Sequence, residues 1–125
     1  MAGIDNIKAL ILKRKEEAKQ IIREYWRNMK PFNTVDDIPD LPIADKDEWN
    51  EFYVPILIRC GAIPKEDLIP GCRYRGTCRN AEIALWTGEK FTYKRTKFNH
   101  IYNEAINHFQ DDDGSDLFVP LFKID

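Results

Sequence analysis

The residues best suited to chemistry in this 125-residue chain lie between positions 71 and 120, and they suit binding rather than bond cleavage. Short stretches with strand-like alternation carry arginine, lysine, asparagine and aromatic side chains. Aromatic rings stack on bases and sugars, and cationic side chains bind anions. The candidate ligand-binding residues are Arg79, Asn80, Glu82, Trp86, Tyr93, Arg95, Lys97 and His108.

A run of aspartates after these residues is assigned a supporting role. Its members are Asp111, Asp112 and Asp116. The run lacks the alternating oxygen ligands and the terminal glutamate of a calcium-binding EF loop. An aspartate-rich turn is commoner than a divalent cation held by His108 and two aspartates. We therefore expect these carboxylates to orient Arg79 and Arg95, and we predict no metal and no other cofactor.

A hairpin would bring most of the candidate residues onto one face of a sheet. Thr87-Gly88 is the best two-residue turn in the region, and it would pair Trp86 with Glu89. Ile83 and Leu85 would then point to the other side, which we expect to be apolar. The same face can equally be a row of core aromatics that needs no ligand. The shared face consists of Asn80, Glu82, Ala84, Trp86, Phe91, Tyr93, Arg95 and Lys97.

Two arginines form a second basic element just before this hairpin. Arg73 and Arg75 alternate with Cys72 and Tyr74, so they are expected to share the outward face of a strand. Such a pair either discourages aggregation at a sheet edge or binds a phosphate group through the guanidinium fork.

The elements that position these residues predict an α+β fold. It has N-terminal helices packed with a small C-terminal antiparallel β-barrel or sheet of SH3-like type. Strands are expected at residues 72–78, 81–86, 89–97 and 117–123, with a less regular one at 101–107. We divide the chain into an amphipathic helix (1–30), a connector with a second helix (31–70) and the barrel (71–125), as one compact domain.

The N-terminal segment predicts an amphipathic helix over residues 6–30, with Asp5 as N-cap and Pro31 as the stop. Arg14 lies near the middle of its apolar stripe. That side chain either extends to solvent or an acidic partner, or lines a ligand site or an oligomer seam. The stripe contains Ile7, Leu10, Ile11, Ala18, Ile21, Ile22, Tyr25 and Met29.

The segment between this helix and the barrel predicts an irregular connector followed by a second helix. The helix is expected to start near Asp45 or Asp47 and to end at Gly61. Pro55 either kinks it or turns residues 54–58 into a short strand. One face of the helix is expected to hold Trp49, Phe52, Tyr53, Ile56 and Cys60.

Charge and cysteine content narrow the class of protein. The net charge of −2 hides a basic zone at residues 71–100, with seven basic and two acidic residues. An acidic zone at 101–125 holds one basic and six acidic residues. Three cysteines without a Cys-x-x-Cys pair, and no segment that could span a membrane, indicate a reduced cytoplasmic protein.

A spaced pattern runs through the second half of the chain. It reads Tyr74-x-Gly76-x-Cys78-Arg79-Asn80-Ala81, Ala84-x-Trp86, Phe91-x-Tyr93-x-Arg95-x-Lys97-Phe98, Ile106-x-His108, Asp111-Asp112 and Gly114-x-Asp116-x-Phe118-x-Pro120. With the lead-in Ile63-Pro64-Lys65-x-x-Leu68, it resembles an uncharacterised family of small bacteriophage and prophage accessory proteins. The resemblance implies a phage-type accessory protein and no particular chemistry. Members of that family tend to have Gly where Asn99 stands, and Pro-Glu in place of Phe109-Gln110.

Four functions compete on this sequence. The leading hypothesis is a non-catalytic, counter-defence type of binding protein that sequesters a nucleotide-like or anionic small ligand. The alternative is a protein-interaction module that inhibits a host protein, with self-association through the N-terminal helix left open. Nucleic-acid binding is disfavoured by the net acidity. A metal-dependent hydrolase around His108 lacks a nucleophile or a histidine–aspartate spacing to support it, so we expect a non-enzyme.

Overall fold

The chain forms two compact units, Met1–Lys30 and Pro31–Asp125, although its length alone suggests one. The computed structural model describes residues 2–77, 81–95, 102–112 and 116–125, without the side chains of residues 2, 94, 95 and 102–105. The first unit is the helix α1, Ala2–Arg27. It starts before Asp5, so the prediction of Asp5 as N-cap is wrong. The carboxylate lies instead in the first turn, where it interacts favourably with the positive end of the helix dipole.

The second unit begins with a connector that leads into a continuous helical stretch. A short 3-10 turn, η1 (Val35–Asp37), is fixed by the Asp37 carboxylate, which accepts the backbone N–H groups of Asn33 and Thr34. Those two hydrogen bonds hold the pKa of Asp37 below its usual value. The predicted start of the second helix is confirmed, because the Asp45 carboxylate accepts the N–H of Glu48 at 2.8 Å.

Pro55 is accommodated by a widened turn in this helix. The stretch consists of α2 (Lys46–Glu48), the π-helical η2 (Trp49–Tyr53) and α3 (Val54–Arg59). The Val54 N–H reaches back five residues to the Trp49 carbonyl, directly before Pro55. A proline ring collides with the preceding turn of a regular α-helix, and the wider turn makes room for it. The alternative of a strand over residues 54–58 is therefore wrong.

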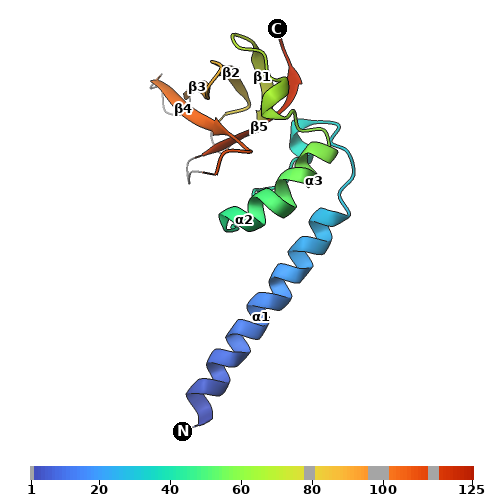
Figure 1. Ribbon diagram of the computed structural model, residues 1–125, viewed down its shortest axis with the longest axis vertical. Coiled ribbons are helices and arrows are strands. Elements are labelled where there is room, and N and C mark those ends of the chain that lie inside the picture. Colours follow the sequence, from blue (N-terminus) through green and yellow to red (C-terminus); the bar gives the residue numbers. More distant parts are fainter. Residues whose placement is uncertain (1, 78–80, 96–101, 113–115) are drawn as a thin grey trace. The chain divides into compact units, whose positions relative to one another are not determined.

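One face of the helix is buried, as its spacing predicts. Trp49, Tyr53, Ile56 and Cys60 are buried and Phe52 is half-buried. The Trp49 Nε1–H donates to the Phe109 carbonyl oxygen at 2.7 Å, which joins the helix to the loop after the fourth strand. At the helix end, Gly61 adopts φ +118° as the predicted cap. The helix lies at the end of the barrel where this loop runs (Figure 1).

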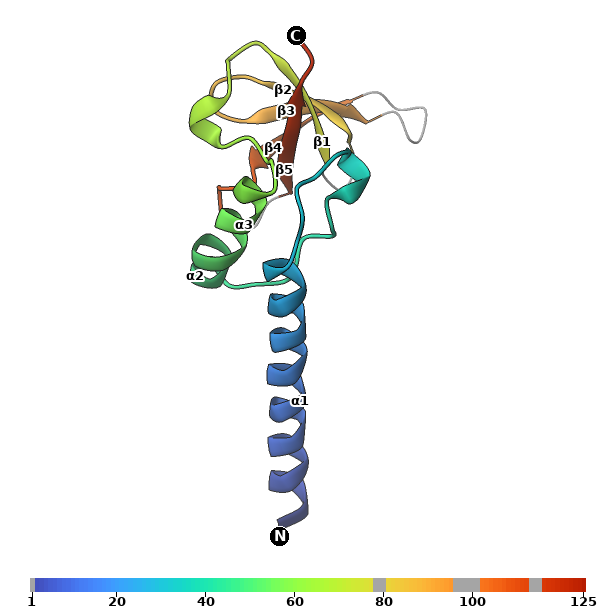
Figure 2. The same ribbon diagram turned by 90° about the vertical axis from the view of Figure 1, so that its right-hand side faces the viewer.

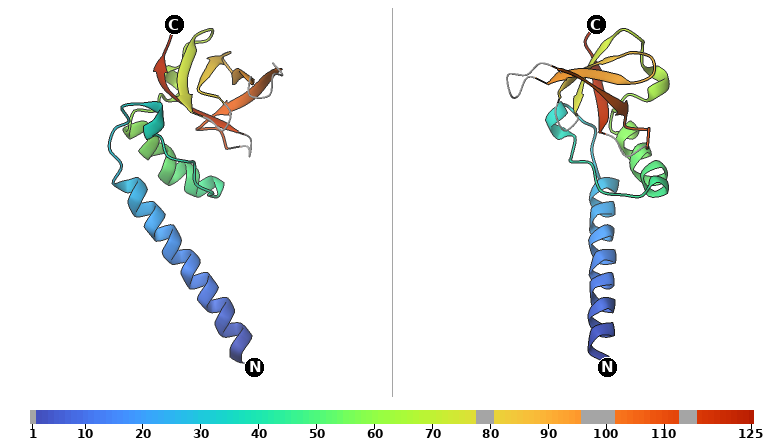
Figure 3. Two further views of the ribbon diagram at one scale, coloured as in Figure 1. Left: turned by 180° about the vertical axis from the view of Figure 1, so that it is seen from behind. Right: turned by 90° about the vertical axis from the view of Figure 1, so that its left-hand side faces the viewer.

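Five strands close into a small barrel, which confirms the predicted fold class. They are β1 (Arg73–Thr77), β2 (Ile83–Trp86), β3 (Phe91–Arg95), β4 (Tyr102–His108) and β5 (Leu117–Lys123). β1 pairs with both β2 and β5, and β3 pairs with β2 and β4, all antiparallel (Figure 2). A short parallel contact between β4 and β5 closes the ring (Figure 3), so the barrel is not wholly antiparallel.

The β2–β3 turn lies one residue further along the chain than predicted. The Thr87 N–H donates to the Lys90 carbonyl, so the central residues are Gly88 and Glu89, and Gly88 has φ +106°. Trp86 therefore pairs with Phe91 rather than with Glu89. Moving a turn by one residue shifts the pairing by two, and two is the side-chain period of a strand. Ala84, Trp86, Phe91 and Tyr93 therefore still share one face, and Ile83 and Leu85 the other.

A close approach between β1 and β5 requires glycine. The register of this pair shifts between Arg75 and Gly76, where β1 bends over Val119 and Pro120. A Cβ atom on Gly76 would collide with the carbonyl oxygen of Val119 and would lie 2.8 Å from Pro120 Cα. Both obstacles are backbone atoms, which cannot rotate away as a side chain can.

We predict that Gly76→Ala destabilises the barrel by about 3 kcal/mol, because the strands must separate to admit the methyl group. Urea unfolding followed by tryptophan fluorescence measures this change. Gly71→Ala is the matched control. Gly71 has φ +86° but no atom near an added Cβ, so its cost is about 1 kcal/mol of backbone strain. Equal losses for the two variants would contradict the steric explanation.

Candidate functional site

The predicted ligand-binding face turns inward and forms the barrel core. Trp86 and Tyr93 are only 2% and 4% exposed, and they pack with Tyr74, Phe91 and Phe118. The Trp86 and Phe91 ring centroids are 4.8 Å apart. Rings buried in this way cannot stack on a base, so the alternative interpretation, a row of core aromatics, describes this face.

The other predicted binding residues do not form one group in the described part of the chain. Glu82 is exposed before β2. Arg79, Asn80 and Lys97 lie outside the described residues, as does the side chain of Arg95. Their grouping around a ligand thus stays a prediction. Ile83 and Leu85, expected on an apolar side, are instead exposed, since this side faces outward.

His108 is a buried neutral histidine that joins two segments. Its Nε2 lies 2.9 Å from the carbonyl oxygen of Ile63, which can only accept, so Nε2 carries the proton. Its Nδ1 accepts the N–H of Gln110 at 3.1 Å. Burial lowers the pKa of His108 to about 4, although the Ile63 carbonyl opposes that shift. With both ring nitrogens engaged inside the protein, His108 has a structural role rather than the predicted ligand contact.

The acidic loop pairs with a lysine that the sequence analysis did not single out. Lys65 Nζ lies 2.9 Å from Asp111 Oδ1, and the Lys65 N–H donates to Gln110 Oε1 at 2.7 Å. Lys65, rather than an arginine, is therefore the cation that Asp111 holds in the described part of the chain. Asp112 is half-buried and Asp116 exposed, and neither has a described ion pair. Together with the His108 contacts, these bonds fasten residues 63–65 to residues 108–111.

A groove of about 520 Å³ opens beside the contact between residues 63–65 and residues 108–111. Lys65 is half-exposed there, and its Nζ lies 5.9 Å from the centre of the Trp86 ring. The groove combines an apolar surface with one ammonium group and one carboxylate, that of Glu66. Its other main lining residues are Pro64, Leu68, Pro70 and Gln110.

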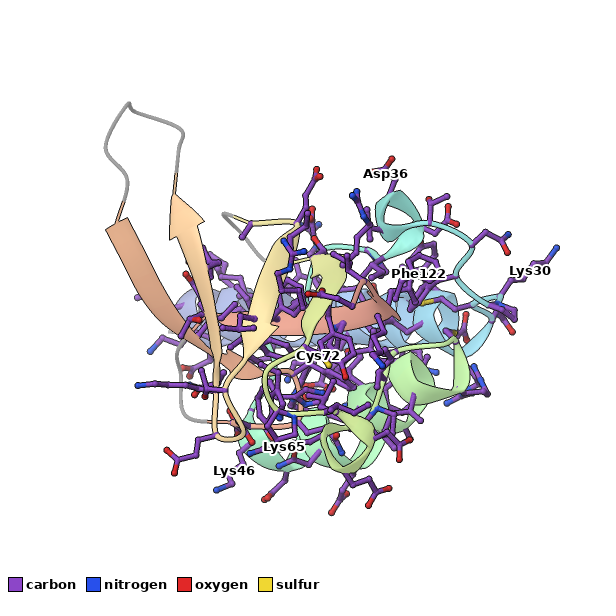
Figure 4. The ribbon with its side chains drawn as sticks, turned by 90° about the horizontal axis from the view of Figure 1, so that it is seen from above. Lys30, Asp36, Lys46, Lys65, Cys72 and Phe122 are labelled. Atoms are coloured by element: carbon purple, nitrogen blue, oxygen red, sulfur yellow. The ribbon has the colours of Figure 1, made fainter. Side chains whose placement is uncertain are left out.

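The second surface feature is a patch on the outside of the barrel, where β1 runs between β2 and β5. Arg75 pairs with Ile83 on one side and Phe122 on the other, and directly paired residues share a face. Figure 4 shows Phe122 and Lys65 in separate parts of the unit, so the patch and the groove are distinct. We call this the outer patch; it consists of Arg73, Arg75, Ile83, Leu85, Phe122 and Ile124.

The outer patch presents apolar side chains around two arginines. Its four apolar residues are 37–42% exposed. Arg73 Nε lies 3.1 Å from both carboxylate oxygens of Asp125, but both side chains are about half-exposed, so the pair contributes little stability. Among the described residues, no acidic side chain pairs with Arg75. The predicted outward direction of both arginines is confirmed.

Sequence reasoning found the two arginines of the outer patch and missed its four apolar residues. The alternation around Arg73 and Arg75 is visible in the sequence. Nothing in it says that Phe122 lies next to Arg75, because the two are far apart in the chain and the contact depends on the β1–β5 register. Lys65 was missed because its neighbours come from residues 86 and 110–111.

Comparisons with known protein families, with curated proteins and with solved structures find no match. The resemblance to phage accessory proteins thus stays a prediction. Within the described ranges, no three metal-ligating side chains gather at one place. In the same ranges, every helix is too short or too polar to cross a membrane.

The lowered pKa of His108 predicts a stability that depends on pH. An unfolded histidine takes up a proton near pH 6.5, whereas the folded one does so near pH 4. The contribution of neutral His108 to the free energy of unfolding is complete above pH 6.5. It is lost as the pH falls toward 4, by roughly 3 kcal/mol in all. Unfolding free energies between pH 7 and pH 4 should therefore fall more steeply for the natural chain than for His108→Gln, which cannot titrate.

An NMR titration of the His108 ring in the natural chain provides a check that needs no variant. A midpoint near 6.5, or parallel stability curves for the two proteins, would show that the ring is not held neutral by burial.

Proposed function

We propose that this protein is a protein-interaction module whose barrel binds a partner through the outer patch. The observation that carries the proposal is the row Ile83–Arg75–Phe122, which spans three adjacent strands. Aromatic residues and arginine dominate the energetics of protein interfaces. In this row they stand side by side on a rigid sheet, so little conformational entropy is lost on binding.

The charge and apolar surface of the outer patch indicate the kind of protein segment that would complement it. Arg75 has apolar neighbours on both sides and no described acidic partner. A complementary segment would place an aspartate or glutamate between apolar side chains. The carboxylate would bind the guanidinium group while the apolar groups cover Ile83 and Phe122. In the setting that the phage resemblance implies, such a partner would be a host protein.

The burial of the predicted stacking rings favours this function over the leading hypothesis from the sequence. The stacking mode predicted from the sequence needs an accessible ring, and Trp86 and Tyr93 are core residues. The outer patch needs no rearrangement of the core before it can bind.

The test is selection of binders from a surface-displayed random peptide library with the full chain as bait. We expect enriched peptides that carry an acidic residue flanked by apolar residues. Their dissociation constants, measured by titration calorimetry, should rise by about tenfold or more for Arg75→Glu and for Phe122→Ala.

Lys90→Glu is the matched control, because it makes the same charge change at the exposed β2–β3 turn, outside the outer patch. Peptide affinity should be unchanged in this variant. The proposal fails if no peptide is enriched, or if the enriched peptides bind Arg75→Glu as tightly as the natural chain.

Binding of an anionic small ligand remains a second candidate, now placed in the groove. The observation that favours it is the Lys65 side chain, which is 41% exposed at the groove and carries an ammonium group that also pairs with Asp111. The predicted residues Arg79, Arg95 and Lys97 take no part in this version.

Calorimetry against cyclic and linear nucleotides tests this candidate. For any nucleotide that binds, Lys65→Met should raise the dissociation constant by about tenfold, because it removes the charge and keeps the stem. The matching change at exposed Lys46 should have no effect. Absence of heat across the whole panel would eliminate the nucleotide version.

A further inference from the structure

Helix α1 carries a regular seam that extends the apolar stripe seen in the sequence. Along it, the separations between seam residues alternate between three and four, which is the a/d spacing of a two-stranded coiled coil. Only one seam position is charged, that of Arg14, and the next seam position is the small Ala18. The seam consists of Ile4, Ile7, Ile11, Arg14, Ala18, Ile21 and Tyr25.

The helix gains no core of its own from this seam. A unit that is one helix has no interior, and eight of its large apolar side chains are 42–68% exposed. An isolated helix in water is only marginally stable, and most helical stability in proteins comes from packing of the apolar face. Five of the eight belong to the seam, and Leu10 and Ile22 flank it.

A parallel pair of these helices would be disfavoured at its centre. In register, Arg14 of one chain would meet Arg14 of the other, with Lys15 of each chain on the flank. Like charges would be brought together in a partly dehydrated seam. In the next layer two Ala18 side chains would face each other and leave a gap. The seam would therefore be too crowded at the Arg14 layer and too loosely filled at the Ala18 layer.

An antiparallel pair resolves both problems. With the two-fold axis at residue 16, each Arg14 lies opposite Ala18 of the other copy, so a long side chain meets a small one. The same register places Ile11 opposite Ile21 and Ile7 opposite Tyr25. Six of the seven seam residues then have a seam partner of suitable size, and Ile4 lies opposite Asn28, beyond the end of α1.

The charges at the centre also become complementary in this register. Position 14 is flanked on the partner helix by position 17, which is Glu17. Each guanidinium group would therefore meet a carboxylate of the other chain, twice by symmetry. Lys15 falls on the opposite flank, near Lys15 of the other chain, where both long side chains reach solvent.

We propose that α1 is a self-association surface that pairs with α1 of a second copy in antiparallel orientation, with Arg14 and Glu17 as the residues that set the orientation. The partner is a second copy of this chain because the seam complements itself in size and in charge. An antiparallel dimer holds the two chains by a two-fold contact, so it would present two outer patches. A partner with two acidic segments would then be bound with increased avidity.

Sedimentation equilibrium of the full chain over a wide concentration range tests the proposal. We expect a monomer–dimer equilibrium. Arg14→Glu should raise the dissociation constant of the dimer by about tenfold or more, because it places two carboxylates together at each central contact. Glu17→Arg should do the same, and the double variant Arg14→Glu with Glu17→Arg should restore much of the affinity.

Lys13→Glu is the matched control, since it changes the same charge next to Arg14 but on the side of the helix away from the seam. It should leave the dissociation constant unchanged, and circular dichroism should show the helix content of the natural chain for Lys13→Glu and for the double variant. A chain that stays monomeric at every concentration overturns the proposal. A tighter dimer in Arg14→Glu would overturn it as well. In a parallel pair the two Arg14 side chains would repel each other, so replacing them would strengthen the dimer.

Discussion

The close approach of β1 to β5 at Gly76 is the contact on which the rest of the barrel depends. β1 is the strand that pairs with both β2 and β5, and the register of the β1–β5 pair shifts between Arg75 and Gly76. Only a residue without a Cβ can lie against the Val119 and Pro120 backbone there. This contact brings the last strand of the chain beside the first and so allows the ring to close. Closure then assigns an inside and an outside to every strand.

The inside is filled by aromatic rings and joined to the helical stretch by polar contacts. Phe91 lies at the centre of this packing, with neighbouring rings from Tyr74, Trp86, Phe118 and His108. His108 then bonds to Ile63 and Gln110, and Trp49 bonds to Phe109. Every buried side-chain nitrogen and oxygen atom in the described part of the chain has a hydrogen-bond partner. The aromatic residues that look most like a binding site in the sequence are therefore core residues.

Two surfaces formed by the described residues of the barrel unit suit recognition, and they differ in chemistry. The outer patch is a sheet face with apolar groups around Arg75, which suits a protein segment. The groove beside Lys65 carries both an ammonium group and a carboxylate. Figure 4 shows Phe122 of the outer patch and Lys65 of the groove apart. The helix α1 supplies a third kind of surface, whose seam complements itself rather than a foreign ligand.

Much of the local structure follows from the sequence alone. Strand alternation determines that Trp86 and Tyr93 share a face and that Arg73 and Arg75 share one, because the side-chain period of two is a local property. The Asp45 cap and the Gly61 stop are equally local. Which face is buried was decided by tertiary structure, since rings, arginines and aliphatic residues are mixed on both faces and only closure of the ring distinguishes them. The neighbours of Arg75 and Lys65 were decided in the same way, because they come from strands and loops that only the fold brings together.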